Sequence, residues 1–347
     1  MIIVVTGAYG FIGSNIIKEL NNRGYTDIIA VDNLTNGNKI SNLIDCEILD
    51  FVDKNTFIQE IENGNYDNQL DYIIHQGACS STVINDGTYM MKNNYDYSTI
   101  LLEYTQKNEI PLLYASSASV YGGHGNAINE FIEKRECEAP LNVYGYSKFL
   151  FDQMVRRYFE NGLSAPVVGL RYFNVYGNKE AHKGRMSSVV YHNYQEFKKH
   201  GKIKLFTGCH GYENGEQMRD FISVSDVVNV NMFFFENHLN DKEEISGIFN
   251  CGTGVARSFN DLSLATINAC RQHDGMDKIT LNNALTNNLI EYIPFPDDLL
   301  DKYQSYTKAN MEALHSSGFN KPFLSLEDGV SEYINILKNT KNEQSNK

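Results

Sequence analysis

Residues 2–13 read IIVVTGAYGFIG, an apolar, β-branched run followed by glycines at positions 7, 10 and 13. The run predicts a buried strand, and the helix after it is expected to open at Gly13. Gly7, Gly10 and Gly13 would let the backbone turn tightly, approach a pyrophosphate and pack helix against strand. The helix N-terminus would attract the negative charge of that group. In this setting the spacing favours a dinucleotide-binding turn over an ordinary glycine-rich turn.

Further β-branched runs alternate with helix-length segments along the first half of the chain. The runs occupy residues 28–31, 72–75, 112–115 and 167–171, and residues 13–24 carry a helical apolar face. Strands separated by helices are typical of parallel sheets. The sequence therefore predicts an α/β fold, a Rossmann-type doubly wound parallel sheet with a smaller interwoven lobe.

The regular alternation of β-branched runs and helix-length segments ends after residue 171. Polar and glycine-rich segments follow, including residues 208–215, before residues 247–250 again read as a strand. We expect a dinucleotide-binding domain at 1–173 and 221–254, and a substrate-binding lobe at 174–220 and 255–338. The polar last residues, KNTKNEQSNK, predict a flexible tail at 339–347.

Composition narrows the class of protein. The chain has 347 residues, 42% of them hydrophobic, and a formal charge of −13, so disorder, nucleic-acid binding and membrane-surface binding are not expected. Six cysteines without paired spacing indicate reduced thiols, and no run is long enough to span a membrane, so we expect a cytoplasmic protein. Nine histidines without ligand spacing predict no catalytic metal.

Asp32 ends the second predicted strand, where a ribose hydroxyl would be held. By itself it favours NAD, whereas Asn33, Lys39 and Lys54 offer groups that would neutralise the 2′-phosphate of NADP. The lysines are also compatible with solvated surface charges. We predict NADP, with NAD as the alternative.

Tyr144 and Lys148 occur in YGYSK, four residues apart, so they share one face of a helix. An ammonium beside a phenol would stabilise the phenolate and lower the tyrosine pKa from about 10 toward neutrality. Ser117 closes the strand LLYASS, where its hydroxyl would hold the alcohol or carbonyl being transformed. A lone YxxxK pattern is more often structural, but after the glycine motif and a strand ending in Ser-Ser it indicates a dehydrogenase-like site.

Together these motifs resemble the extended short-chain dehydrogenase/reductases, whose members act on nucleotide sugars. HQGA (75–78), ACSST (78–82), RYFNVYG (171–177), HKG (182–184) and MRDF (218–221) make the chain similar to one family of them, the ADP-L-glycero-D-manno-heptose 6-epimerases. The likeness covers residues 1 to about 337.

The resemblance implies an NADP-dependent isomerase that inverts carbon 6 of the heptose, from D-glycero to L-glycero. Hydride leaves carbon 6, giving a ketone, and returns to the opposite face; the product is a precursor of the lipopolysaccharide core. Tyr144 and Lys183 would be the two acid/base groups, assisted by Lys148 and Ser117. The family also implies a homo-oligomer, with a homopentamer as its typical form.

Carried over position by position, the resemblance also implies two sets of contacts. Cofactor contacts would be Gly7, Gly10, Phe11, Ile12, Gly13, Asp32, Asn33, Lys39, Lys54, Gln76, Gly77, Ala78, Cys79, Ser80, Asn93, Lys148 and Lys183. Substrate contacts would be Ser117, Asn174, Arg185, His192, Phe206, Thr207, Gly208, Cys209, Arg219 and Tyr303. Arg219 and His192 would supply the local donors that an ADP pyrophosphate needs in an acidic protein.

Three departures from the family pattern bear on the sugar. Arg185 replaces a serine, residues 206–209 read FTGC instead of FEGS, and Gln76 replaces an acidic residue. The alternatives are an epimerase, dehydratase or reductase acting on another nucleotide sugar, or a non-catalytic cofactor sensor. Ala118 and Ser119 stand where dehydratases carry an acidic pair, and sensors typically lose the Tyr or the Lys, so both alternatives rank below the epimerase.

Overall fold

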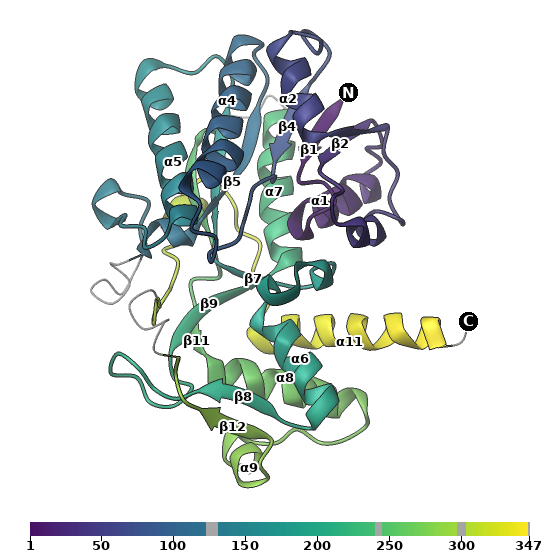
Figure 1. Ribbon diagram of the computed structural model, residues 1–347, viewed down its shortest axis with the longest axis vertical. Coiled ribbons are helices and arrows are strands. Elements are labelled where there is room, and N and C mark those ends of the chain that lie inside the picture. Colours follow the sequence, from purple (N-terminus) through teal and green to yellow (C-terminus); the bar gives the residue numbers. More distant parts are fainter. Residues whose placement is uncertain (123–130, 240–244, 297–302, 346–347) are drawn as a thin grey trace.

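The computed structural model describes residues 1–122, 131–239, 245–296 and 303–345. Within these residues a seven-stranded parallel sheet has the order β10-β6-β5-β4-β1-β2-β3 (Figure 1). Its strands are β1 (Ile3–Thr6), β2 (Ile28–Asp32), β3 (Asp50–Asp53), β4 (Tyr72–His75), β5 (Leu112–Ser117), β6 (Val167–Tyr172) and β10 (Gly247–Cys251). The predicted α/β fold with a Rossmann-type parallel sheet is confirmed.

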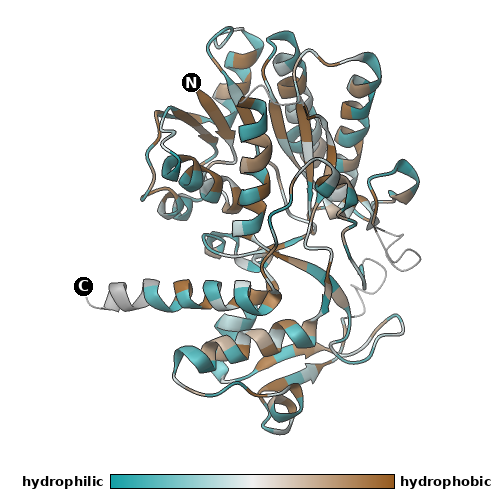
Figure 2. Cartoon of the chain, turned by 180° about the vertical axis from the view of Figure 1, so that it is seen from behind, coloured by the Kyte–Doolittle hydropathy of each residue, from teal (hydrophilic) through white to brown (hydrophobic). Residues whose placement is uncertain are grey.

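Helices cover both faces of this sheet because its strands carry apolar side chains on both sides. Ile3 and Val5 of β1 join the core beneath α1 (Phe11–Asn22) and α7 (Val224–Leu239), whereas Val4 joins the core on the other face. That second core packs under α2 (Lys54–Glu62), α4 (Tyr97–Lys107) and α5 (Val143–Asn161). The strands are correspondingly hydrophobic in Figure 2. Because successive side chains of a strand enter opposite cores, a shift by one residue would exchange them, and this fixes the register of each strand.

The turn between β1 and α1 needs its glycines. Gly7 has a φ of +65°, and a side chain there would meet the backbone of Gly77 at 2.8 Å. A Cβ on Gly13 would lie 2.2 Å from the carbonyl oxygen of Gly7. Helix α1 begins at Phe11, two residues before the predicted start. The glycine spacing therefore allows α1 to sit directly on the end of β1.

A smaller sheet system lies at the other end of the molecule (Figure 1). Strand β9 (Met218–Ser223) pairs in parallel with β7 (Asn174–Tyr176) and antiparallel with β11 (Ala256–Ser258). Strand β12 (Ile290–Ile293) pairs in parallel with β8 (Ile203–Phe206). Helices α6 (Val189–His200), α8 (Phe259–His273) and α9 (Leu281–Thr286) pack around these strands.

The short helices complete the description. They are α3 (Gly87–Met90), which continues through a π-helical turn (Met91–Asp96) into α4, and α10 (Glu312–Ser316). Short 3₁₀ segments lie at Gly37–Asn42, Ala118–Val120, Arg135–Cys137 and Ala181–Met186. No helix within the described residues is long and apolar enough to cross a membrane.

The C-terminal segment of the chain is helical. Helix α11 (Leu326–Ser345) packs against α8 through Val330, Tyr333 and Ile334, which are buried at helical spacing. The helix started by these apolar residues continues through the polar ones as far as Ser345, and so extends into the segment predicted as a flexible tail, 339–347. The flexibility of that segment stays a prediction. Residues 346–347 lie outside the described part of the chain.

Candidate active site

A cavity of about 520 Å³ opens at the carboxyl ends of β1, β2, β4, β5 and β6. This is the edge at which parallel sheets bind ligands. The structure brings to it Tyr144, Ser117 and every residue expected to bind the cofactor: Gly7, Gly10, Phe11, Ile12, Gly13, Asp32, Asn33, Lys39, Lys54, Gln76, Gly77, Ala78, Cys79, Ser80, Asn93, Lys148 and Lys183. Gly7, Asn33, Lys54 and Gln76 directly follow β1, β2, β3 and β4.

The N-terminus of α1 at this cavity suits an anion. Its cap, Gly10, has no side chain to accept from the first-turn N–H groups, and Gly10 itself donates to the carbonyl oxygen of Gly7 at 2.9 Å. The first turn of α1 contains no acidic residue. Free N–H groups, the helix dipole and the absence of a side chain together fit a dinucleotide pyrophosphate.

The next strand ends in an ion pair. The Asp32 carboxylate is buried, pairs with the Lys39 ammonium at 2.8 Å and accepts from the backbone N–H of Tyr9 at 2.9 Å. Lys54 donates to the side-chain oxygen of Asn93, and burial lowers the pKa of Lys54. These groups place a hydroxyl acceptor and two cations at one end of the cavity.

Helix α5 is held to the sheet by a buried ionic group. Arg171 of β6 and Asp152 of α5 pair at 2.8 Å, and both are fully buried. Asp152 also accepts from the hydroxyls of Tyr114 and Ser116 of β5, each at 3.0 Å. Because Asp152 lies one turn after Lys148, this group fixes the helix face that carries Tyr144 and Lys148.

Lys148 and Tyr144 do not interact as the spacing predicted. Lys148 is 3% exposed and its Nζ donates to the carbonyl oxygen of Ala115 at 2.7 Å. Burial lowers its pKa to about 8, with Asp152 opposing the shift. The pKa of Tyr144 is raised by burial instead of lowered by Lys148; the Ser117 hydroxyl opposes this shift. The expected lowering is wrong for this structure because the ammonium is directed at a carbonyl group.

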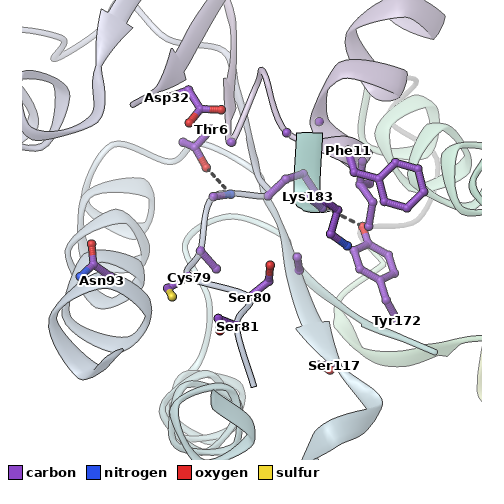
Figure 3. A pocket seen from close by; sticks show the side chains of 18 of the residues that line it. Thr6, Phe11, Asp32, Cys79, Ser80, Ser81, Asn93, Ser117, Tyr172 and Lys183 are labelled. Atoms are coloured by element: carbon purple, nitrogen blue, oxygen red, sulfur yellow. Dashed lines mark hydrogen bonds between the residues drawn. The ribbon is translucent and has the colours of Figure 1, made fainter. Parts of the chain in front are cut away.

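Lys183 lies on the opposite side of the cavity from Asn93 and Cys79 (Figure 3). Its ammonium is 5.3 Å from the centre of the Phe11 ring, and burial lowers its pKa while Glu180 opposes the shift. Gly184 follows with a φ of +55°, which kinks the segment Ala181–Met186. Tyr144 from α5 and Lys183 from the segment after β7 thus approach one cavity from different elements.

Several lining residues escaped the sequence analysis. Thr6 accepts from the backbone N–H of Gly77 at 3.0 Å, and Tyr172 donates to Gln76 at 3.0 Å; Figure 3 shows both bonds. Thr6 and Tyr172 stood inside the quoted motifs TGAYGFIG and RYFNVYG, so position at a strand end was a usable signal. The remaining ones are Val31, Ser81, Tyr89, Ala115, Phe173, Val175 and Met186. Ser116 in the strand LLYASS, His182 in HKG, and Tyr97 also line the cavity.

The other expected substrate residues fall into two sets, and none lines this cavity. Arg219 is buried 4.9 Å from the ring centre of Tyr303, and Gln217 donates to both Thr207 and Cys209. Phe206 and Gly208 belong to the same segment, so Phe206, Thr207, Gly208, Cys209, Arg219 and Tyr303 form one cluster, here called the Arg219 cluster.

Asn174, Arg185 and His192 are exposed at the surface. A ring nitrogen of His192 lies 3.4 Å from the carbonyl oxygen of Arg185. Lys183 lines the cavity but Arg185 does not, and Gly184 between them kinks the backbone with a φ of +55°. The structure therefore does not bring these three residues to the cavity.

A buried cation lies within the Arg219 cluster. Arg219 donates to the carbonyl oxygen of Met218, and burial lowers its pKa, with Tyr303 opposing the shift. Among the ion pairs of the described residues none involves Arg219. An anionic ligand would satisfy this guanidinium.

Comparison with known proteins identifies the family. Residues 3–252 match the model of the NAD dependent epimerase/dehydratase family. The chain belongs to this family. An ADP-L-glycero-D-manno-heptose-6-epimerase of Thiobacillus denitrificans (strain ATCC 25259 / T1) is 54% identical over 96% of this chain and 98% of its own. The resemblance inferred from the motifs is confirmed.

Solved structures of epimerases share the fold. A Helicobacter pylori ADP-L-glycero-D-manno-heptose-6-epimerase has a TM-score of 0.75 at 27% identity, covering 97% of this chain and 96% of its own. A UDP-glucose 4-epimerase of Thermotoga maritima, solved with UDP-glucose, has a TM-score of 0.76 at 25% identity, covering 98% and 99%. Membership of the NAD dependent epimerase/dehydratase family agrees with the nicotinamide dinucleotide for which the cavity is suited.

Proposed function

We propose that the protein inverts carbon 6 of the heptose in an ADP-glycero-manno-heptose, from D-glycero to L-glycero, and uses NADP. The observation that carries the proposal is the position of Tyr144 and Lys183, which line one cavity from different elements. Inversion of a carbon needs a proton carrier near each face of the sugar. The 54% identity to a heptose epimerase supports the choice of sugar.

The position of each residue in the cavity suggests its role in the reaction. Ser117, at the end of β5, interacts with the Tyr144 phenol and would orient the sugar hydroxyl from which Tyr144 takes a proton. Lys148, which lines the cavity, would bind the cofactor, and Lys183 would hold or move the proton at the opposite face. A nicotinamide cofactor, when bound, would supply hydride acceptance and return, which no side chain supplies.

NADP is proposed over NAD because Lys39 and Lys54 flank the buried Asp32 carboxylate. Asp32 by itself would suit a free 2′-hydroxyl, but its charge is compensated by Lys39 at 2.8 Å. Lys54, half-buried and with its pKa lowered by burial, has the carboxamide of Asn93 as its partner. A 2′-phosphate would meet two cations there.

The test is to incubate the purified protein with ADP-D-glycero-D-manno-heptose and to follow the carbon 6 signals by NMR, without and then with added NADP. Formation of the L-glycero epimer without an added oxidant is expected. Reduced product formed only with stoichiometric NADPH, or no change with NADP present, would contradict the proposal.

Variants test the two proton carriers. Tyr144→Phe and Lys183→Ala should each lower turnover by about 10²-fold or more and leave the fold intact. Tyr146→Phe, two residues away on the same helix and 47% exposed, is the control for Tyr144. Lys199→Ala, on the exposed end of α6, is the control for Lys183. A fully active Lys183→Ala enzyme would show that Lys183 is not the second proton carrier.

A further inference from the structure

Glu180 is a fully buried carboxylate whose described partners include no cation. It lies three residues before Lys183 in the segment 177–188, which connects β7 to α6. Burying a carboxylate without an ion pair is costly unless hydrogen bonds compensate, so the position calls for an explanation.

The Glu180 carboxylate joins the two ends of this segment. It accepts from the backbone N–H of Gly177 at 3.2 Å, and from both the backbone N–H and the hydroxyl of Ser188, the hydroxyl at 2.7 Å. The carbonyl oxygen of Glu180 accepts from the backbone N–H of Lys183 at 3.0 Å. One residue therefore closes the loop and fixes the backbone of Lys183.

The same carboxylate connects the segment to the C-terminal helix. The phenol of Tyr333, 3% exposed on α11, hydrogen-bonds to Glu180, and this carboxylate helps to raise the pKa of the phenol. From the other side, Asn15 donates to the carbonyl oxygen of Asn178 at 3.0 Å and Asn42 donates to that of Lys179 at 3.1 Å. The segment is thus held by α1 and the 3₁₀ segment Gly37–Asn42 on one side and by α11 on the other.

We propose that Glu180 is the positioning residue for Lys183: it closes the segment 177–188 and ties it to α11, so that the Lys183 ammonium stays at the cavity beside Phe11. The inference rests on the proposed role of Lys183 as the second proton carrier. It adds a residue that touches neither substrate nor cofactor, and it gives α11 a part in the site.

Glu180 affects the pKa of Lys183, so its positioning role can be measured through that pKa. Lys183 faces the uncharged Phe11 ring from α1, and Glu180 in its own segment raises its pKa against the effect of burial. Burial, and after it the charges of Lys39 and Lys183, lower the pKa of the adjacent His182. On the far side, Glu180 faces Tyr333 of α11, which also faces Tyr191 of α6. Removing the Glu180 charge should therefore lower the pKa of Lys183 further.

The experiment compares Glu180→Gln with the wild-type enzyme in three measurements. Turnover of ADP-D-glycero-D-manno-heptose should fall by about 10-fold in kcat with a smaller change in KM. Amide hydrogen exchange in peptides covering 177–188 should be faster by about 10-fold. The rate at which an amine-reactive label modifies Lys183, followed against pH by mass spectrometry, should give a pKa lower by about one unit. A role in packing alone would not move that pKa.

Two further variants sharpen the test. Glu196→Gln removes the same charge from α6, where the Glu196 carboxylate accepts from the backbone of Lys204, and should leave the labelling profile of Lys183 unchanged. Tyr333→Phe removes only the phenol that Glu180 accepts from, and should speed exchange in 177–188 and lower kcat by about 3-fold. If Glu180→Gln does not fold, an unchanged kcat and exchange rate in Tyr333→Phe overturn the inference.

The two proposals fail in different ways. A wild-type enzyme that leaves the ADP-heptose unchanged overturns the proposed function. An active wild-type enzyme together with a Glu180→Gln variant whose kcat and Lys183 labelling profile are both unchanged overturns the positioning role alone.

Discussion

The Nζ of Lys148 lies 2.7 Å from the carbonyl oxygen of Ala115, at the point where β5 enters the cavity. Spacing along α5 puts Lys148 on the same face as Tyr144, but this bond aims its ammonium at the strand. The backbone of β5 therefore holds the charge of Lys148 at the strand. Its burial lowers the pKa to about 8, within the range of an ordinary activity assay.

Activity should therefore fall as the pH rises through about 8. The Lys148 pKa lies below the usual value near 10.5, so the positive charge that Lys148 would offer to the bound cofactor is lost above that pH. The measurement is kcat between pH 6 and pH 10. Asp152 raises the Lys148 pKa, so Asp152→Asn should move this limb to lower pH if the helix stays in place. A profile flat to pH 10 would contradict the assignment.

Arg219→Met should raise the KM for the ADP-sugar by about 30-fold or more, because a buried guanidinium is expected to bind the pyrophosphate. Its thermal unfolding temperature without substrate should stay the same or rise, since the described residues offer Arg219 no carboxylate.

Arg257 is the matched control because it lies directly opposite Arg219 in the β11–β9 register and pairs with Glu327 and Asp261. Arg257→Met should leave KM unchanged and cost about 1 kcal/mol or less of stability. Equal KM values for Arg219→Met and the wild type would show that the Arg219 cluster does not bind the substrate.

Lys39→Gln tests the cofactor preference. It removes the cation 2.8 Å from Asp32 and leaves the carboxylate able to hold a 2′-hydroxyl. Affinity for NADP should fall by about 10-fold or more, while affinity for NAD should change by less than about 3-fold. Both are measured as dissociation constants by fluorescence titration. An equal loss for the two cofactors would mean that Lys39 does not contact the 2′-phosphate.

Sequence patterns predicted the parts of the fold that β-branched runs and glycines determine. The strands at 28–31 and 72–75 carry such runs and were found, whereas β3, with the sequence DFVD, is short, ends in acidic residues and escaped notice. The sequence analysis predicts no helix at Leu326–Ser345, and the last residues of α11 carry no apolar signal of their own.

Within the site, motifs located the residues but not their contacts. A four-residue spacing says which face Tyr144 and Lys148 share, not that the lysine reaches Ala115. Likewise, the position of Arg185 two residues after Lys183 does not reveal that Arg185 lies outside the cavity that Lys183 lines. Such contacts depend on tertiary packing that linear spacing does not encode.

His75 should make the protein less stable in mild acid. The ring is fully buried at the end of β4, 2.6 Å from the Thr6 hydroxyl and 2.8 Å from that of Ser98. Burial, with a contribution from Lys148, lowers its pKa to about 3, whereas an unfolded histidine titrates near 6.5. Between these values the unfolded chain binds a proton that the folded protein does not.

The stability contributed by neutral His75 is therefore complete above pH 6.5 and is lost as the pH falls from there toward 3. The loss should approach about 1.4 kcal/mol per pH unit below pH 6. Urea unfolding at pH 7, 6 and 5 measures it. His75→Gln should be less stable at pH 7 but should have a shallower pH dependence, smaller by one proton. His200→Gln, exposed at the end of α6, should keep the wild-type slope. A His75→Gln slope equal to that of the wild type would show that another group takes up the proton.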